Sequence, residues 1–236
     1  MKRLAVLALF VTTLAVAAPV PKVKPNNFGT AVEIKGVTCE MLRTGELRVR
    51  VSKEAASESD AHLATRPLVT RTVEGDFELT VRITHTPPED KELATAVGNG
   101  EPIASAGLAL HRSDGKRGSL VILNRLSQGR DGWDSYFRMS ALYETKDTQG
   151  VVGNLSSHRK FSNEPIYLRL TRRGDEFTAT KSDDGKEWSP VFDETREVPG
   201  LGPVVIGPVA VHNTNARHDV TFDEYVLNPL KTGEKK

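Results

Sequence analysis

Alternation of apolar and polar residues is the dominant pattern along this chain. Between residues 76 and 85, Phe77, Leu79, Val81 and Ile83 alternate with charged residues and threonine. A period of two residues is typical of a β-strand with one face in a core and the other in water. The pattern predicts strands at 31–39, 46–51, 67–73, 76–85, 104–112, 118–125, 135–144, 165–173, 176–182, 204–212 and 218–227. Their even spacing, with hardly a helical segment between them, predicts an all-β sandwich or barrel.

The segment from Glu164 to Glu187 shows this pattern most clearly. Two alternating stretches, IYLRLTRRG and EFTATKS, predict an antiparallel hairpin closed by an Asp-Asp-Gly turn that leads to Trp188. From the alternation we expect one shared core, containing Phe77, Leu79, Val81, Leu108, Leu110, Leu168, Leu170, Val220 and Phe222.

The first 17 residues have the features of a cleaved secretory signal peptide. Lys2 and Arg3 precede an apolar run from Leu4 to Val16, and Ala15-Val16-Ala17 supplies the small residues of a cleavage site. An uncleaved anchor is the alternative, but the run is shorter than the ~20 residues that a spanning helix needs. No second run of that length follows, so we expect no membrane span. The predicted location is outside the cell, or in the periplasm or cell envelope.

Charge and cysteine content limit the possible partners of the protein and the sources of its stability. Loss of Lys2 and Arg3 with the signal peptide removes two positive charges and changes the formal charge from +1 to −1. No basic stripe remains, which argues against a nucleic-acid partner. The lone cysteine, Cys39, cannot form an intrachain disulfide, and its setting predicts a buried strand residue. Stability must therefore come from the core.

Several short segments resemble one family in the same order along the chain. They are 73–77 (VEGDF), 105–110 (SAGLAL), 167–170 (YLRL) with 173–175 (RGD), 182–185 (SDDG) with Trp188, and 221–225 (TFDEY), preceded by 45–49 (GELRV) with His62, Ala64 and 66–67 (RP). They are similar to the concanavalin A-like lectin/glucanase superfamily, in its secreted branch of unassigned function related to the C-terminal sandwich of some β-xylosidases. The resemblance covers roughly residues 30–228. It implies a two-sheet antiparallel jelly-roll sandwich and no particular reaction.

The expected domain organisation follows from these features. Residues 1–17 are a signal peptide, 18–29 a flexible leader, 30–228 the concanavalin A-like β-sandwich and 229–236 a flexible tail.

The carboxylates Glu74, Asp76 and Glu78 are the candidates for catalysis. One branch of the superfamily contains glucanases with a Glu-x-Asp-x-Glu strand, and alternation on one strand would place all three carboxylates on one face. Gly75 stands where those glucanases carry a branched apolar residue, and it favours a turn before the strand instead. We therefore predict no catalysis at these residues.

The segment 124–138 is the candidate for ligand binding. Trp133 and Tyr136 supply aromatic faces, and Asn124, Asp134 and Arg138 supply hydrogen-bonding groups. Carbohydrate recognition uses this mixture, because the CH face of a sugar lies on an aromatic ring while polar groups bind its hydroxyls. The alternative is that both aromatic residues close one end of the sandwich.

Two further sets of polar residues complete the candidates. His111-Arg112 and His212-Asn213 end two apolar strands and are expected to face a shared groove, with His111 near the ligand; no metal is assigned to a histidine. The superfamily often holds a structural calcium ion, and Asp76, Asp219 or Asp223 could contribute oxygens. No other cofactor is expected.

A single turn, Ser182 to Trp188, is similar to the Asp-box turn of sialidases. In that motif, Asp and Ser side chains bind the turn backbone, Gly takes a positive φ and Trp packs beneath. Only one copy is present, so a structural role is predicted, although an exposed Trp beside a sheet edge could also stack on a sugar.

The sequence favours a secreted, non-catalytic, lectin-like module that binds extracellular or envelope carbohydrate. The alternatives are a glycoside hydrolase or related sugar-processing enzyme, and a structural module of the envelope. Two carboxylates about 5–9 Å apart in a cleft would favour the enzyme, and an exposed aromatic platform without them would favour the lectin. The sequence leaves the sugar and the oligomeric state open.

Processing of the signal peptide is directly testable. We expect the exported protein to begin near Ala18 or Pro19, because cleavage follows Ala15-Val16-Ala17. Intact-mass measurement of protein exported by its host checks this. Exported material that still carries Met1 would show that the apolar run is an anchor.

Overall fold

The computed structural model describes residues 28–55, 67–85, 102–113, 120–128, 134–144, 149–160, 164–193 and 195–231. Along 120–128, 134–144 and 149–160 it describes the backbone and, among the side chains, that of Phe137. The predicted signal peptide, most of the predicted leader and Trp133 lie outside the described residues. Within the described ranges, no helical segment has the length and apolarity of a membrane span.

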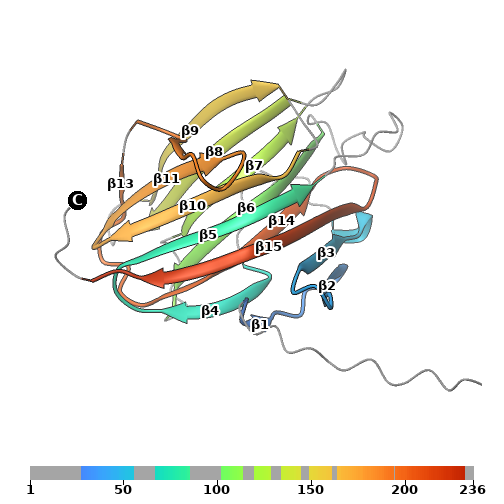
Figure 1. Cartoon of the computed structure of the whole chain (residues 1–236), viewed down its shortest axis with the longest axis horizontal. Helices are drawn as coiled ribbons and strands as arrows, with labels where there is room; N and C mark the ends of the chain where they lie inside the picture. The colour runs from blue at the N-terminus through green and yellow to red at the C-terminus, as the bar shows by residue number, and fades with distance from the viewer. Residues whose placement is uncertain are drawn as a thin grey trace, which may run out of the picture.

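The strands form two antiparallel sheets that face each other (Figure 1). The first contains, in order across the sheet, β1 (Thr30–Ala31), β4 (Val69–Val73), β14 (Val204–His212), β6 (Ile103–Arg112), β7 (Leu120–Gln128), β8 (Asp134–Glu144) and β9 (Gln149–Lys160). The second contains β12 (Ser189–Pro190), β11 (Glu176–Ser182), β10 (Ile166–Arg173), β5 (Phe77–His85), β15 (His218–Pro229), β3 (Leu47–Val51) and β2 (Val37–Met41), and β13 (Arg196–Glu197) pairs with β11. A 3-10 turn, Lys53–Ala55, follows β3. The predicted all-β, two-sheet sandwich is confirmed.

One hydrophobic core fills the space between the sheets. All nine core residues predicted from the alternation belong to it and are buried. The first sheet adds Phe137 of β8, and Phe177 of β11 is buried beside the leucines of β10. Cys39 of β2 is partly buried against this core, and burial raises the pKa of its thiol above the usual value. The cysteine therefore acts as a small apolar residue, as its setting predicts.

Three details differ from the predicted strands. The expected strand 31–39 is divided into β1 and β2, which lie in different sheets. The hairpin of β10 and β11 closes at Gly174, with φ +60°, whereas the Asp-Asp-Gly turn connects β11 to β12. The twelve-residue strand β9 has no counterpart among the predicted strands. A shift in its pairing with β8, between Met139 and Ala141, interrupts the regular register there.

A β-bulge in β15 changes which residues face the core. Asp223 is opposite Arg82 and Val226 is opposite Thr80, so β15 uses one residue more than β5 between these pairs. Glu224 takes φ +46°, which side chains other than glycine rarely adopt. As a result Asp223 and Glu224 are adjacent on the outer side. Tyr225 turns inward, where its ring lies 4.7 Å from that of Phe28.

Three buried histidines lie together at one end of the core. His218 of β15 is 5.5 Å from His85 and 5.9 Å from His212, measured between ring centroids. His212 is anchored by Thr214 through Nδ1, at 3.0 Å, and by the Ser52 carbonyl through Nε2, at 3.1 Å. Burial, together with the neighbouring His212, lowers the pKa of His218 to about 3. Burial also lowers the pKa of His212. The folded protein therefore keeps His218 neutral.

Stability should fall as the pH drops below about 6.5. Unfolded His218 takes up a proton near its ordinary pKa, whereas folded His218 does so only near pH 3. Between these values the unfolded state binds more protons, which contributes up to about 1.4 kcal/mol per pH unit to the slope of the unfolding free energy. Urea titrations from pH 4.5 to 7.5 measure the slope. His218→Leu should reduce it, and an unchanged slope would assign the proton uptake to another group.

Candidate functional site

A row of side chains crosses the outer face of the second sheet. The backbone register aligns Ser182 of β11, Tyr167 of β10, Arg82 of β5 and Asp223 of β15 across four neighbouring strands. In antiparallel sheets such partners lie on one face, opposite the buried leucines and valines. Together with their neighbours, the residues that contact one another here form what we call the outer-face cluster. It consists of Arg82, Tyr167, Arg169, Trp188, Asp223 and Glu224.

Two aromatic rings and two guanidinium groups form one half of the outer-face cluster. The Arg169 guanidinium carbon is 3.6 Å from the centroid of the Trp188 ring, and that of Arg82 is 5.9 Å from the Tyr167 ring. The Tyr167 and Trp188 rings meet edge to face at 6.3 Å and 76°. Both aromatic residues are half-buried. Cation–π contacts thus hold the rings in place while part of their surface stays open to solvent.

Ion pairs form the other half. Arg82 donates to Asp223 through Nε at 2.6 Å and through Nη2 at 2.7 Å, a bidentate pair. Its Nη1 lies 3.4 Å from Oε1 of Glu224, and the Tyr167 hydroxyl donates to the same oxygen at 2.9 Å. The hydrogen bond to Asp223 raises the pKa of Arg82 above its usual value. Burial, followed by the Glu224 contact, raises the pKa of Tyr167, so the phenol remains a donor.

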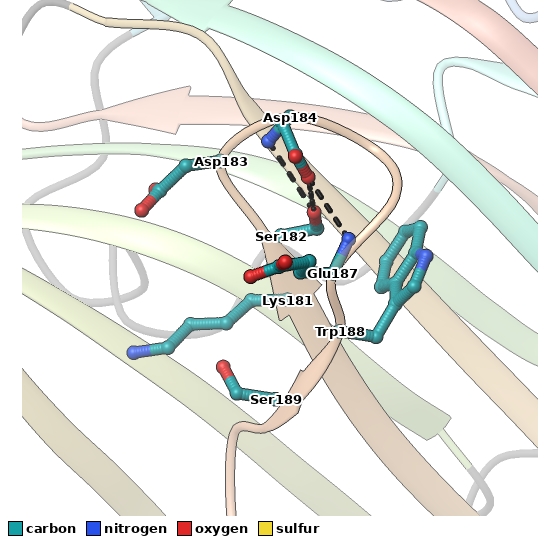
Figure 2. A pocket seen from close by; sticks show the side chains of 7 residues that line it. All are labelled: Lys181, Ser182, Asp183, Asp184, Glu187, Trp188 and Ser189. Atoms are coloured by element: carbon teal, nitrogen blue, oxygen red, sulfur yellow. Dashed lines mark hydrogen bonds between the residues drawn. The ribbon is translucent and has the colours of Figure 1, made fainter.

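The turn from Ser182 to Trp188 holds the tryptophan beside this face (Figure 2). Ser182 Oγ accepts from the backbone N–H groups of Asp184, at 3.3 Å, and Gly185, at 2.9 Å. Asp184 Oδ1 accepts from the backbone of Lys186 and Glu187, and these hydrogen bonds lower its pKa. Gly185 has φ +74°, and a Cβ there would come within 3.0 Å of the Tyr167 ring. The structural role predicted for this turn is confirmed.

A surface pocket of about 440 Å³ lies at the same turn. Its lining consists of Lys181, Ser182, Asp183, Asp184, Glu187, Trp188 and Ser189. Figure 2 shows the side chains of Lys181, Asp183 and Glu187 on one side of the turn and the Trp188 indole pointing to the other. Lys181 Nζ lies 4.4 Å from the Phe137 ring, between the two sheets. Trp188 is the one aromatic residue of this lining, and its ring also belongs to the outer-face cluster through its contact with Arg169.

The three candidate catalytic carboxylates do not share one strand face. Glu74 and Asp76 lie in the turn before β5, where Gly75 has φ +76°, so the turn alternative is confirmed. Asp76 Oδ1 accepts from the backbone N–H of Gly174 at 2.7 Å. Glu78 is on β5, where its Oε1 lies 3.6 Å from Arg169 Nε.

The candidate ligand segment 124–138 is mainly strand rather than loop. Residues up to Gln128 belong to β7, and β8 begins at Asp134. The register pairs Asn124 with Arg138, and Tyr136 follows Asp134 by two residues on β8. Trp133 lies outside the described residues.

The predicted shared groove of His111 and His212 is wrong. β6 and β14 are antiparallel, with Val205 opposite His111 and His212 opposite Ala104, so the two histidines lie at opposite ends of the pair. His111 Nδ1 is 2.8 Å from the Arg112 carbonyl. His212 belongs instead to the buried histidines.

The three candidate calcium ligands are far apart and have other partners. Asp219 pairs with Arg217 at 2.7 Å, and Asp223 with Arg82. Asp76 lies just before β5 and six residues before Arg82, a separation of about 20 Å at the rise of a strand. Throughout the part of the chain that the structure describes, no three His, Cys, Asp or Glu side chains are grouped to hold a metal ion.

Comparison with solved structures places the fold among proteins of known architecture. A functionally unknown protein from Saccharomyces cerevisiae is similar, with a TM-score of 0.57 and 16% identity over 88% of this chain and 100% of that one. The xylan β-1,4-xylosidase from Bacillus halodurans C-125 matches with a TM-score of 0.53 and 15% identity over 86% of this chain. The fold is concanavalin A-like.

The concanavalin A-like sandwich occurs in proteins of different length and activity. This chain spans only 38% of the xylosidase. The marine PL7 alginate lyase AlyA1 from Zobellia galactanivorans matches with a TM-score of 0.50 and 8% identity, over 84% of this chain and 82% of that one. No family model and no curated protein matches the sequence. At these identities the matches establish the fold alone, and they confirm the fold that the sequence resemblance implies.

Replacing Ser182 should show how far the turn depends on its hydroxyl. Ser182→Ala removes the acceptor for two backbone N–H groups from a site that is 3% exposed, so we expect a loss of about 1–2 kcal/mol in unfolding free energy. Ser189→Ala, at an exposed position of the same segment, is the matched control and should change stability by less than about 0.5 kcal/mol. Equal effects in urea titrations would contradict the assigned role.

Proposed function

We propose that this protein is an exported, non-catalytic, lectin-like module that binds extracellular or envelope carbohydrate at the outer-face cluster. The observation that carries the proposal is the arrangement of the Trp188 and Tyr167 rings beside the paired groups of Arg82, Asp223 and Glu224. The export part rests on the signal peptide features of residues 1–17.

The chemistry of the cluster suits a sugar ring. A pyranose has an apolar CH face and a rim of hydroxyl groups, so it needs an aromatic surface with donors and acceptors at its edge. Trp188 and Tyr167 supply the surface, and Arg169 and Glu224 supply polar groups alongside. Because cross-strand contacts hold these side chains, little rotamer entropy should be lost on binding.

The contacts of the carboxylates favour binding over hydrolysis. A glycosidase needs one carboxyl group that gives a proton and a second that acts as base or nucleophile. In the cluster, Asp223 and Glu224 are both held by Arg82, and Glu78 lies beside Arg169. Carboxylates that arginines already engage do not form the free pair that hydrolysis uses, whereas their remaining oxygen lone pairs can accept hydrogen bonds from sugar hydroxyls. The names of the fold neighbours, a xylosidase and an alginate lyase, support carbohydrate as the ligand class.

Removal of the Trp188 ring tests the site. A screen against a panel of neutral and acidic oligosaccharides first identifies a glycan that binds. Trp188→Ala should then weaken its affinity by roughly 5–30-fold, equivalent to about 1–2 kcal/mol of aromatic contact. Because the Trp188 ring also packs on Arg169, we expect the Trp188→Ala variant to have a lower melting temperature than the wild type. The binding titrations are therefore run well below the melting temperature of the variant.

Trp133→Ala is the comparison variant, since it removes the other tryptophan of the chain. Normal binding by Trp188→Ala, with loss of binding in Trp133→Ala, would move the site to residues 129–133. Normal binding by both variants would exclude an aromatic platform built on either tryptophan.

A further inference from the structure

Glu224 combines an unusual backbone with an unusual position. It is the only residue other than glycine with a positive φ among those the structure describes, and it lies at the bulge of β15. Strained backbone persists where the surroundings enforce it, and bulges often re-aim a side chain at a functional site. Here the bulge places two consecutive carboxylates, Asp223 and Glu224, on the outer side of the sheet.

The two carboxylates have different surroundings. The Asp223 side chain is 11% exposed, and its two oxygens bind Arg82. The Glu224 side chain is 52% exposed. Its contacts with Tyr167 and Arg82 both use Oε1, so they leave Oε2 to accept a hydrogen bond from outside the protein. Asp223 therefore positions Arg82, whereas Glu224 is open to solvent on one side.

We propose that Glu224 selects a neutral, hydroxyl-rich glycan and rejects acidic glycans at the outer-face cluster. This inference rests on the proposed function and names its ligand class. A carboxylate accepts hydrogen bonds from sugar hydroxyls and repels a uronate or sulfate group.

The arginines of the cluster support the same ligand class. Arg82 donates hydrogen bonds to Asp223 through Nε and Nη2, and its Nη1 lies beside Glu224. Arg169 stacks on Trp188, and its Nε donates to Thr80 Oγ1 at 3.2 Å beside Glu78. An acidic sugar would have to compete with Asp223 and Glu224 for Arg82. A neutral sugar can bind without disturbing them.

Isothermal titration with two kinds of probe tests the proposal. The probes are neutral hexasaccharides derived from xylan, cellulose and mannan, and a hexauronate derived from alginate. We expect wild-type protein to bind at least one neutral probe and to bind the hexauronate at least tenfold more weakly. Glu224→Gln should weaken neutral binding roughly 5-fold, because a charge-assisted hydrogen bond becomes a neutral one, and should narrow the difference between the probes.

Glu40→Gln is the matched control. Glu40 lies on β2 of the same sheet and is 49% exposed, and its carboxylate is 3.4 Å from Arg50, the same distance that separates Glu224 from Arg82. This variant changes the net charge equally and should leave both affinities unchanged. If Glu40→Gln changes binding as much as Glu224→Gln, the effect comes from overall charge and the proposal is overturned.

The outcomes separate this inference from the proposed function. Loss of binding in Trp188→Ala with unchanged binding and selectivity in Glu224→Gln would keep the site and overturn the role of Glu224. Unchanged binding in both variants would overturn the site itself. Wild-type protein that prefers the hexauronate, or that binds no neutral probe, would overturn the ligand class.

A second measurement tests whether the backbone at Glu224 is strained. Glu224→Ala and Glu224→Gly both remove the carboxylate, but only glycine adopts a positive φ without a steric cost. We expect the glycine variant to melt about 2–4 °C above the alanine variant. The reverse order would show that the bulge does not enforce the position of Glu224 and would overturn that part of the argument.

Discussion

The division of each strand into an inner and an outer face is the constraint on which this structure depends. Along β5, Phe77, Leu79, Val81 and Ile83 are fully buried, and the residues between them face outward. The inner set contacts the opposite sheet and supplies the hydrophobic stabilisation. The outer set is free to carry polar and aromatic groups. A slip of one residue would exchange the sets, so the core also fixes the register that assembles the outer-face cluster.

Regular alternation made most of the fold predictable from the sequence. The nine predicted core residues lie in one core because each is an apolar residue at an inward-facing position of its strand. The prediction failed where the regular strand pattern is interrupted. An example is β9, whose pairing with β8 shifts register near Gly153. The sheet to which a strand belongs was not predictable either. The split of 31–39 into β1 and β2 arises because their partners differ: Thr30 of β1 pairs with Thr70, which is distant in sequence, whereas Cys39 of β2 pairs with Val49 of the next strand.

The candidate site was harder to predict, because its residues meet only through the order of strands in the sheet. Arg82, Tyr167 and Asp223 are far apart in sequence, and the sequence does not state that β5 lies between β10 and β15. One local signal was present. Phe222 and Tyr225 are three residues apart where a period of two is expected, which is the pattern of a bulge. The weak identity to the xylosidase and the lyase is consistent with this view, since a shared sandwich does not require a shared set of outer residues.

The position of the last two long strands has a consequence for the order of folding. β14 lies between β4 and β6 in one sheet, and β15 lies between β5 and β3 in the other. Both sheets thus receive a central strand from the end of the chain, and neither is continuous until residues 204–229 have been synthesised. Such long-range pairing slows folding, because β5 and β6 must wait for β15 and β14 as neighbours. A chain that stopped before β14 would therefore lack a central strand in both sheets at once, and neither half of the sandwich could close by itself.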